Sequence, residues 1–144
     1  MLRARNSRFA GLASSLLLLA AATPVLAHHS AAQFDASKRI TVEGTVTSWQ
    51  WTNPHAWLQI VAPDAKGQAI EMGFELGSPN TLVRNGFRAD SFKPGDHVTV
   101  VGSPRKDGKP GGGLTMVKTA DGHWLQWGPG ADAKAAAAAG VPTK

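Results

Sequence analysis

The 144-residue sequence contains no cysteine and no tyrosine. The lack of cysteine excludes disulfides, thiolate metal ligands and a cysteine nucleophile, and it excludes a lipid-carrying cysteine behind a cleaved leader. Any metal bound by this chain must therefore be held without thiolate ligands. Because tyrosine is also missing, aromatic contacts must come from the five tryptophans, the five phenylalanines and the histidines.

Acidic residues are scarce as well, with 10 against 15 lysines and arginines, which gives a formal net charge of +5. Three basic residues, Arg3, Arg5 and Arg8, precede an apolar run at 11–22, and a stretch with small residues ends at Ala27. This order is typical of a secretory signal peptide over residues 1–27. The alternative is a membrane anchor, but the uncharged run is short for a membrane span.

Cleavage after Ala27 would change the charge of the chain. Loss of the three arginines leaves 12 basic and 10 acidic side chains, a balance of +2. A balance this weak gives no electrostatic footprint for nucleic acid. We therefore expect a soluble periplasmic or secreted protein, with no nucleic-acid partner and no membrane attachment after cleavage.

Apolar alternation in the middle of the chain predicts strands. The predicted strands cover 40–47, 56–62, 68–76, 97–101 and 114–119, and a sixth over 123–127 is left open. A short helix is expected to begin at Ser78-Pro79 and to end at Asn85-Gly86, with Leu82 and Val83 buried. The glycine-rich segment 105–113 is predicted to be a mobile loop.

This order of elements predicts an all-β fold with one short helix. It matches a five- to six-stranded OB-like barrel with the order β-β-β-α-β-β(-β), and a half-open sandwich is the alternative. The barrel should occupy residues 40–128, after an arm at 28–39 pinned by Phe34 and before a disordered alanine, glycine and proline tail at 129–144. The expected core residues are Val42, Val46, Leu58, Ile60, Phe74, Val98, Val100 and Met116.

The stretch from Trp49 to Trp57 holds three of the five tryptophans and one of the five histidines around an Asn-Pro turn. Strand alternation places Trp49 and Trp51 on a polar face, unless a bulge near Ser48 returns them to the core. If Trp49, Trp51 and Trp57 are exposed, their rings can stack on sugar rings or another flat ligand. Packing in the core is the alternative for each ring.

Six short motifs are spread over the chain from His28 to Asp96. They are His28-His29-Ser30, Phe34-Asp35, Gly44-Thr45-Val46, Trp51-Thr52-Asn53-Pro54-His55, Phe74-Glu75-Leu76-Gly77-Ser78-Pro79-Asn80 and Lys93-Pro94-Gly95-Asp96. Together they resemble a family of small secreted bacterial proteins classed as a domain of unknown function. The resemblance implies a domain from His28 to about Trp127, and it carries no established activity.

If the mature chain begins at His28, that residue carries a free amine beside its own imidazole. The amine, the ring nitrogen and one more imidazole form the tetragonal nitrogen set that copper(II) prefers. We therefore predict a metal site from His28, with His29 and His55 as further candidate ligands. In this one feature it resembles the N-terminal histidine copper sites of secreted copper carriers and polysaccharide oxygenases. The alternative is a solvated chain end without metal, and His97 and His123 are expected on the surface.

Glu75, on the polar face of the third predicted strand, is a candidate partner that orients an imidazole of such a site. The alternative for this carboxylate is an ion pair with Arg84 or Arg88. The sequence shows no spacing typical of paired catalytic carboxylates, and no phosphate loop, dinucleotide fingerprint or hydrolase motif. These absences argue against a hydrolase and favour a binding protein over an enzyme, with a copper oxidase as a third alternative.

Two functions are consistent with these residues. The first is an exported copper(II)-binding protein, in which a metal ion is the partner. The second is a module without metal that binds a carbohydrate, an envelope component or a protein partner through an aromatic face formed by Trp49, Trp51, Trp57 and Glu75.

Overall fold

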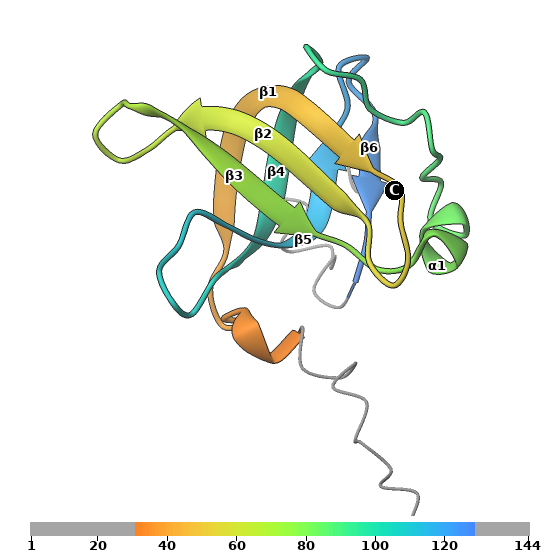
Figure 1. Cartoon of the computed structure of the whole chain (residues 1–144), viewed down its shortest axis with the longest axis horizontal. Helices are drawn as coiled ribbons and strands as arrows, with labels where there is room; N and C mark the ends of the chain where they lie inside the picture. Colours follow the sequence, from red (N-terminus) through yellow and green to blue (C-terminus); the bar gives the residue numbers. More distant parts are fainter. Residues whose placement is uncertain (1–30, 129–144) are drawn as a thin grey trace, which may run out of the picture.

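Six strands and one short helix make up the computed structural model, which describes residues 31–128 (Figure 1). The elements are the 3₁₀ turn η2 (Ala31–Gln33), β1 (Ile40–Gln50), β2 (Trp57–Pro63), β3 (Ala69–Glu75), α1 (Pro79–Val83), β4 (His97–Pro104), β5 (Gly111–Lys118) and β6 (Trp124–Gln126). The predicted order, with the helix between the third and fourth strands, is confirmed. The signal peptide and the tail predicted at 129–144 lie outside the described residues.

The sheet closes into a barrel because β3, at one edge of the sheet, also pairs with β5. Its order is β3-β2-β1-β4-β5-β6, and β3 also pairs with β5 in parallel. Residues 73–75 of β3 pair with residues 111–113 of β5, and this parallel pairing forms the seam of the barrel. The fold is therefore a closed five-stranded mixed barrel with β6 as an extra strand, and the half-open sandwich is excluded.

The prediction that 105–113 is one mobile loop is wrong for its last three residues, which begin β5. A Cβ atom on Gly111 would lie 2.1 Å from the carbonyl oxygen of Gly73, and the backbone φ of Gly111 is +100°. Only glycine tolerates both conditions without strain. The glycines are there because two backbones approach closely at the seam, not because the chain is loose.

The interior of the barrel carries the apolar faces of the alternating strands. Its buried cluster consists of Val46, Ala56, Leu58, Ile60, Ala62, Met72, Phe74, Leu76, Leu82, Phe87, Phe92, Val98, Val100, Leu114 and Val117. Six of the expected core residues belong to it. Val42 is half-buried against this cluster, and Met116 is fully buried but pairs with Val101 outside it.

The prediction that Val83 is buried is wrong, since it is 45% exposed. Leu82 is fully buried, as expected. Adjacent side chains on an α-helix point about 100° apart, so Leu82 and Val83 do not both face the core. Its N-cap residue, Ser78, makes no side-chain capping hydrogen bond, and the helix is held mainly by the burial of Leu82 and Pro79.

A β-bulge in β1 determines the direction in which Trp49 and Trp51 point. The register of β1 on β2 shifts between Val46 and Ser48. Beyond the shift Trp49 pairs with the fully buried Leu58, so its ring turns toward the core, where Trp51 also packs. The expectation of a bulge near Ser48 is confirmed, and the extra residue reverses the alternation of the strand.

The N-terminal arm runs beside the β4–β5 loop, although more than sixty residues separate them in sequence (Figure 1). Phe34 forms an isolated β-bridge with Arg105. The amide of Asp35 donates to the carbonyl of Pro104 at 2.9 Å, and the amide of Lys106 donates to the carbonyl of Gln33 at 2.9 Å. These contacts hold the arm against the barrel and fix the position of the Gln33 side chain.

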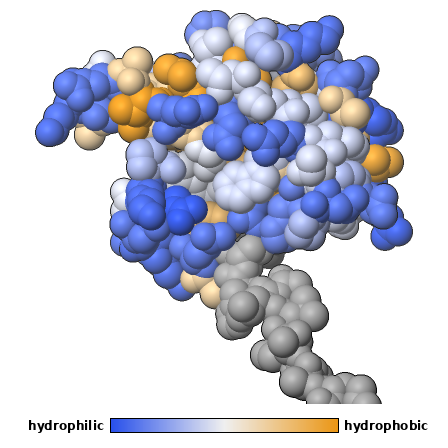
Figure 2. All heavy atoms as spheres, viewed as in Figure 1, coloured by the Kyte–Doolittle hydropathy of each residue, from blue (hydrophilic) through white to orange (hydrophobic). Residues whose placement is uncertain are grey.

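The surface seen in Figure 2 is mostly polar, and its apolar colour is confined to small areas, one of them over the β2–β3 hairpin. Val61 on β2 is 36% exposed. Within residues 31–128 no helix has the length and apolar character needed to cross a membrane.

Candidate functional site

Two chain segments meet at the start of β2 and place a histidine beside a glutamate. The amide of Ala56 donates to the carbonyl of Gly77 at 3.0 Å, and the amide of Leu76 donates back to the carbonyl of Ala56 at 2.9 Å. Trp57 pairs with Glu75 in the β2–β3 ladder. This reciprocal pairing brings the residue before Ala56, His55, next to the C-terminal end of β3.

His55 and Glu75 form the centre of the candidate site. The imidazole Nδ1 lies 2.5 Å from Oε1 of Glu75, and the side chains are 28% and 6% exposed respectively. The amide Nε2 of Gln33 donates to the other carboxylate oxygen, Oε2, at 3.1 Å. Each oxygen of this buried carboxylate therefore has a protein partner, one from the β1–β2 loop and one from the N-terminal arm.

The geometry determines what His55 can offer to a ligand. A buried carboxylate is costly unless it is paired and hydrogen-bonded, so Glu75 favours a hydrogen on the facing Nδ1 atom. With Nδ1 donating, the lone pair of a neutral imidazole lies on Nε2. No hydrogen bond involves Nε2 of His55 among residues 31–128. This atom is thus the natural acceptor or metal ligand of the site.

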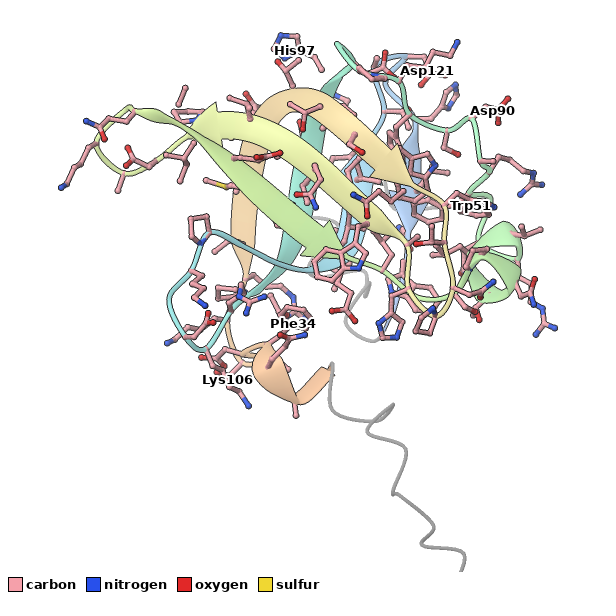
Figure 3. The ribbon with its side chains drawn as sticks, in the orientation of Figure 1. Phe34, Trp51, Asp90, His97, Lys106 and Asp121 are labelled. Atoms are coloured by element: carbon pink, nitrogen blue, oxygen red, sulfur yellow. The ribbon has the colours of Figure 1, made fainter. Side chains whose placement is uncertain are left out.

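A pocket of about 230 Å³ opens beside this pair. Its lining residues are Phe34, Ala36, His55, Glu75, Leu76, Gly77, Ser103, Gly113, Leu114, Thr115, Trp127 and Gly128. Aromatic rings and aliphatic side chains supply most of the wall, and the imidazole and carboxylate form its polar corner. Figure 3 shows Phe34 on the arm side of the barrel, away from Trp51.

The Asp35 carboxylate stabilises a turn within the arm. The hydroxyl of Ser37 donates to Asp35 at 2.6 Å, and the ammonium of Lys38 lies 3.2 Å from the same carboxylate. The hydrogen bond from Ser37 is the largest influence that lowers the pKa of Asp35 below its usual value, followed by Lys38. Asp35 therefore stays ionised into mild acid.

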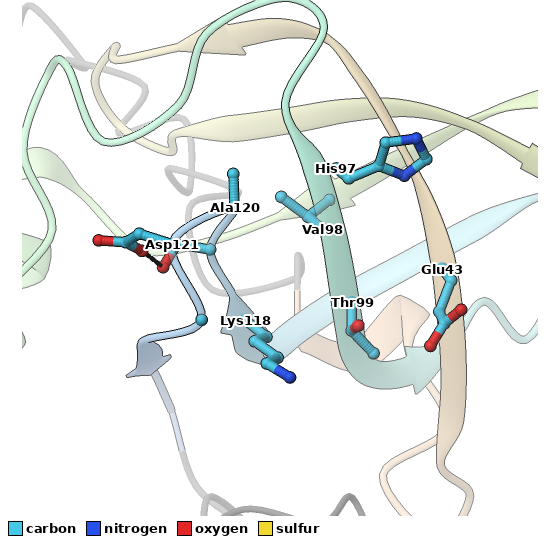
Figure 4. Close-up of a pocket in the computed structure, with 9 residues that line it drawn as sticks. Glu43, His97, Val98, Thr99, Lys118, Ala120 and Asp121 are labelled. Carbon is cyan, nitrogen blue, oxygen red and sulfur yellow. Dashed lines mark hydrogen bonds between the residues drawn. The ribbon is translucent and has the colours of Figure 1, made fainter.

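The remaining histidines of the described chain lie elsewhere. His97 and His123 are exposed, as expected. Figure 4 shows His97 and Glu43 on one side of β4 and Asp121 on the other, so these side chains do not converge. Within residues 31–128 no three histidine, aspartate or glutamate side chains are grouped closely enough to hold a metal ion.

The three tryptophans proposed as a binding face do not share one face. Trp49 lies 5.1 Å from Phe92 and 5.5 Å from Trp51, measured between ring centroids, and its indole nitrogen donates to the carbonyl of Arg88. Trp57 instead pairs with Glu75 and is absent from the core cluster. The first two rings thus pack as part of the core, and Trp57 alone of the three lies beside the candidate site.

A model of a family of unknown function, DUF6152, matches residues 15–115 of the chain. The chain belongs to the DUF6152 family. The matched region contains both His55 and Glu75, and the predicted resemblance to a domain of unknown function is confirmed. That such proteins are bacterial and secreted stays a prediction. Neither the curated proteins nor the solved structures contain a match to this DUF6152 chain.

Sequence reasoning identified some residues of the candidate site and missed others. His55 and Glu75 are in contact, and no ion pair joins Glu75 to Arg84 or Arg88 in the described structure. His28 and His29 lie outside the described residues. Gln33 was missed because the arm has no period from which its contacts can be inferred. Trp127 was also missed, although Gly77, two residues after Glu75, lies where a Cβ atom would meet the Trp127 ring.

Proposed function

We propose that this protein is an exported copper(II)-binding protein in which Nε2 of His55 and the N-terminal histidines hold the ion. The observation that supports this most is the contact of His55 Nδ1 with the buried Glu75 carboxylate at 2.5 Å. Metal-binding histidines commonly donate their second N–H to a carboxylate, which fixes the ring and raises the basicity of the ligating nitrogen.

The length of the arm is compatible with a shared site. Gln33 already touches Glu75 at 3.1 Å. His28 precedes Gln33 by five residues, and five residues span at most about 18 Å when fully extended. The amine and imidazole of His28 are therefore within chain reach of His55. His29 has the same access and is the reserve ligand.

The available donors favour copper(II) among divalent ions. The chain has no cysteine, so thiolate ligands are excluded. A set built from an amine and imidazoles is rich in nitrogen, and copper(II) has the highest affinity for such sites in the divalent series. Since residues 31–128 hold no complete ligand group, the set requires donors from before residue 31.

The test is a change of the first mature residue. An alanine inserted before His28 keeps every imidazole but moves the amine away from the His28 ring. We expect it to weaken copper(II) binding about as much as His55→Ala does, measured by competition with a copper chelator. Binding should also fall in acid, because protons compete with the metal for the nitrogen ligands.

His123→Ala is the matched control, because its side chain is 81% exposed and does not line the pocket beside His55. It should leave the affinity unchanged. Equal copper affinity in the alanine-extended and parent proteins would falsify the N-terminal site. That result would favour the second hypothesis, a module that binds a carbohydrate or an envelope partner, with Trp57 as its aromatic contact.

A further inference from the structure

The pocket beside His55 has the size of one substituted aromatic ring. A cavity of about 150 Å³ holds benzene, so a volume of about 230 Å³ leaves room for a ring with a few substituent atoms. Drug-sized ligands and cofactors need pockets of about 300 Å³ or more. The volume therefore excludes a nucleotide or a disaccharide as a fully enclosed ligand.

Two glycines leave the space in which aromatic rings form two walls of the pocket. A Cβ atom on Gly77 would lie 2.2 Å from the Trp127 ring, and one on Gly113 would lie 2.8 Å from the Phe34 ring. Each ring thus packs directly on the backbone, where any larger residue would push it away. Aromatic walls favour another flat ring through stacked or edge-to-face contact.

The polar side chains of the pocket are mostly occupied by protein partners. Both oxygens of Glu75 are taken, Ser103 Oγ accepts from Arg39 at 2.9 Å, and Thr115 Oγ1 donates to the carbonyl of Val101 at 2.9 Å. In the described structure, two ring nitrogens among the lining residues lack such a partner: Nε1 of Trp127, which can only donate, and Nε2 of His55, which can accept. As an acceptor, it selects a ligand that donates an O–H group.

We propose that this pocket binds a small single-ring aromatic alcohol, a phenol, whose hydroxyl donates to Nε2 of His55. The ring lies between Phe34 and Trp127, and the hydroxyl meets the polar corner. This binding does not depend on the copper function, although both use the same nitrogen. A metal ion and a phenol hydroxyl therefore compete for His55 Nε2.

The probes are 4-fluorophenol and 4-fluorotoluene, which have nearly the same shape and differ in the O–H donor. Each is titrated into the full protein by ¹⁹F NMR with a chelator present, so the result is independent of copper. We expect saturable binding of 4-fluorophenol with a Kd of about 1 mM, within the ceiling for so small a ligand. The toluene should bind about tenfold more weakly, since it lacks one hydrogen bond.

Two variants locate the binding. His55→Phe keeps a ring but removes the acceptor, so the two probes should then bind alike. Ala36→Phe fills the pocket from an exposed position that should not affect folding, and it should abolish binding of both probes. The matched control is Ala120→Phe, at an exposed alanine outside this pocket.

Three outcomes would overturn the proposal. They are the absence of saturable 4-fluorophenol binding, equal binding of the two probes to the parent protein, and equal binding to the Ala36→Phe and Ala120→Phe variants. If His55→Phe fails to fold, the exposed pair of alanine variants still decides the question. None of these outcomes alters the copper titration, so failure here is distinct from failure of the metal site.

Discussion

The substitution Glu75→Gln tests the central contact of the site while it preserves the shape of the side chain. Glu75 accepts one hydrogen bond from His55 and one from Gln33, through two different oxygens. A glutamine has one accepting oxygen and one amide group that only donates. Either one of the two donors loses its partner in a site where residue 75 is 6% exposed, or the imidazole takes the other tautomer, so that Nδ1 accepts from the amide and Nε2 loses its lone pair. Leaving such a donor unpaired costs about 1–3 kcal/mol of folding free energy.

The same substitution should weaken copper(II) binding. Loss of a carboxylate that orients a metal-binding histidine typically lowers metal affinity about 10- to 100-fold, which is about 1.4–2.7 kcal/mol. Denaturant unfolding in the presence of a chelator measures the first effect, and chelator competition measures the second. Glu71→Gln is the matched control, since Glu71 is an exposed carboxylate on the same strand. If the two variants bind copper equally well, Glu75 does not orient a ligand and the reasoning fails.

Two further predictions concern the barrel seam and the arm. Gly111→Ala should destabilise the protein by about 1–3 kcal/mol more than Gly108→Ala in denaturant unfolding, because both have positive φ but only the first would place a Cβ against Gly73; equal losses would show that the seam is not tightly packed. Ser37→Ala removes the main influence that lowers the pKa of Asp35, so that pKa should rise toward 3.8 in an NMR titration. The stabilisation that Asp35 gives to this turn within the arm is lost as pH falls through its folded pKa, so in the variant it should be lost at a higher pH; an unchanged pKa would refute the assignment.

The strand pattern was predictable because burial on one face imposes a period of two on the sequence. Leu58 and Ile60 alternate with half-exposed neighbours, and the structure buries both. The seam was not predictable in this way. Residues 111–113 have no apolar period, and their glycines resemble a loop until the approach of β3 is known. The signal for that approach is a contact between segments almost forty residues apart, which local pattern does not contain.

The candidate site shows the same division between local and distant information. The alternation of side chains predicts that Glu75 lies on the outer face of β3. The loop after Trp51 brings His55 to the start of β2, which pairs with β3. Gln33 reaches the carboxylate only because the arm is bridged to the β4–β5 loop at Arg105, a contact that no period in the arm indicates.

Because the arm is bridged to the β4–β5 loop, Glu75 contacts both parts of the proposed metal site, which are His55 and the N-terminal arm. His55 and the arm each hold one oxygen of Glu75, so the arm is docked at the same group that orients the imidazole. A metal bound by both His55 and the chain before residue 31 stabilises the docked arm, because a ligand stabilises whichever conformation it binds. By linkage, docking of the arm must strengthen metal binding by the same factor. Gln33 is therefore expected to raise copper affinity without touching the metal, by keeping the arm where its histidines can reach His55.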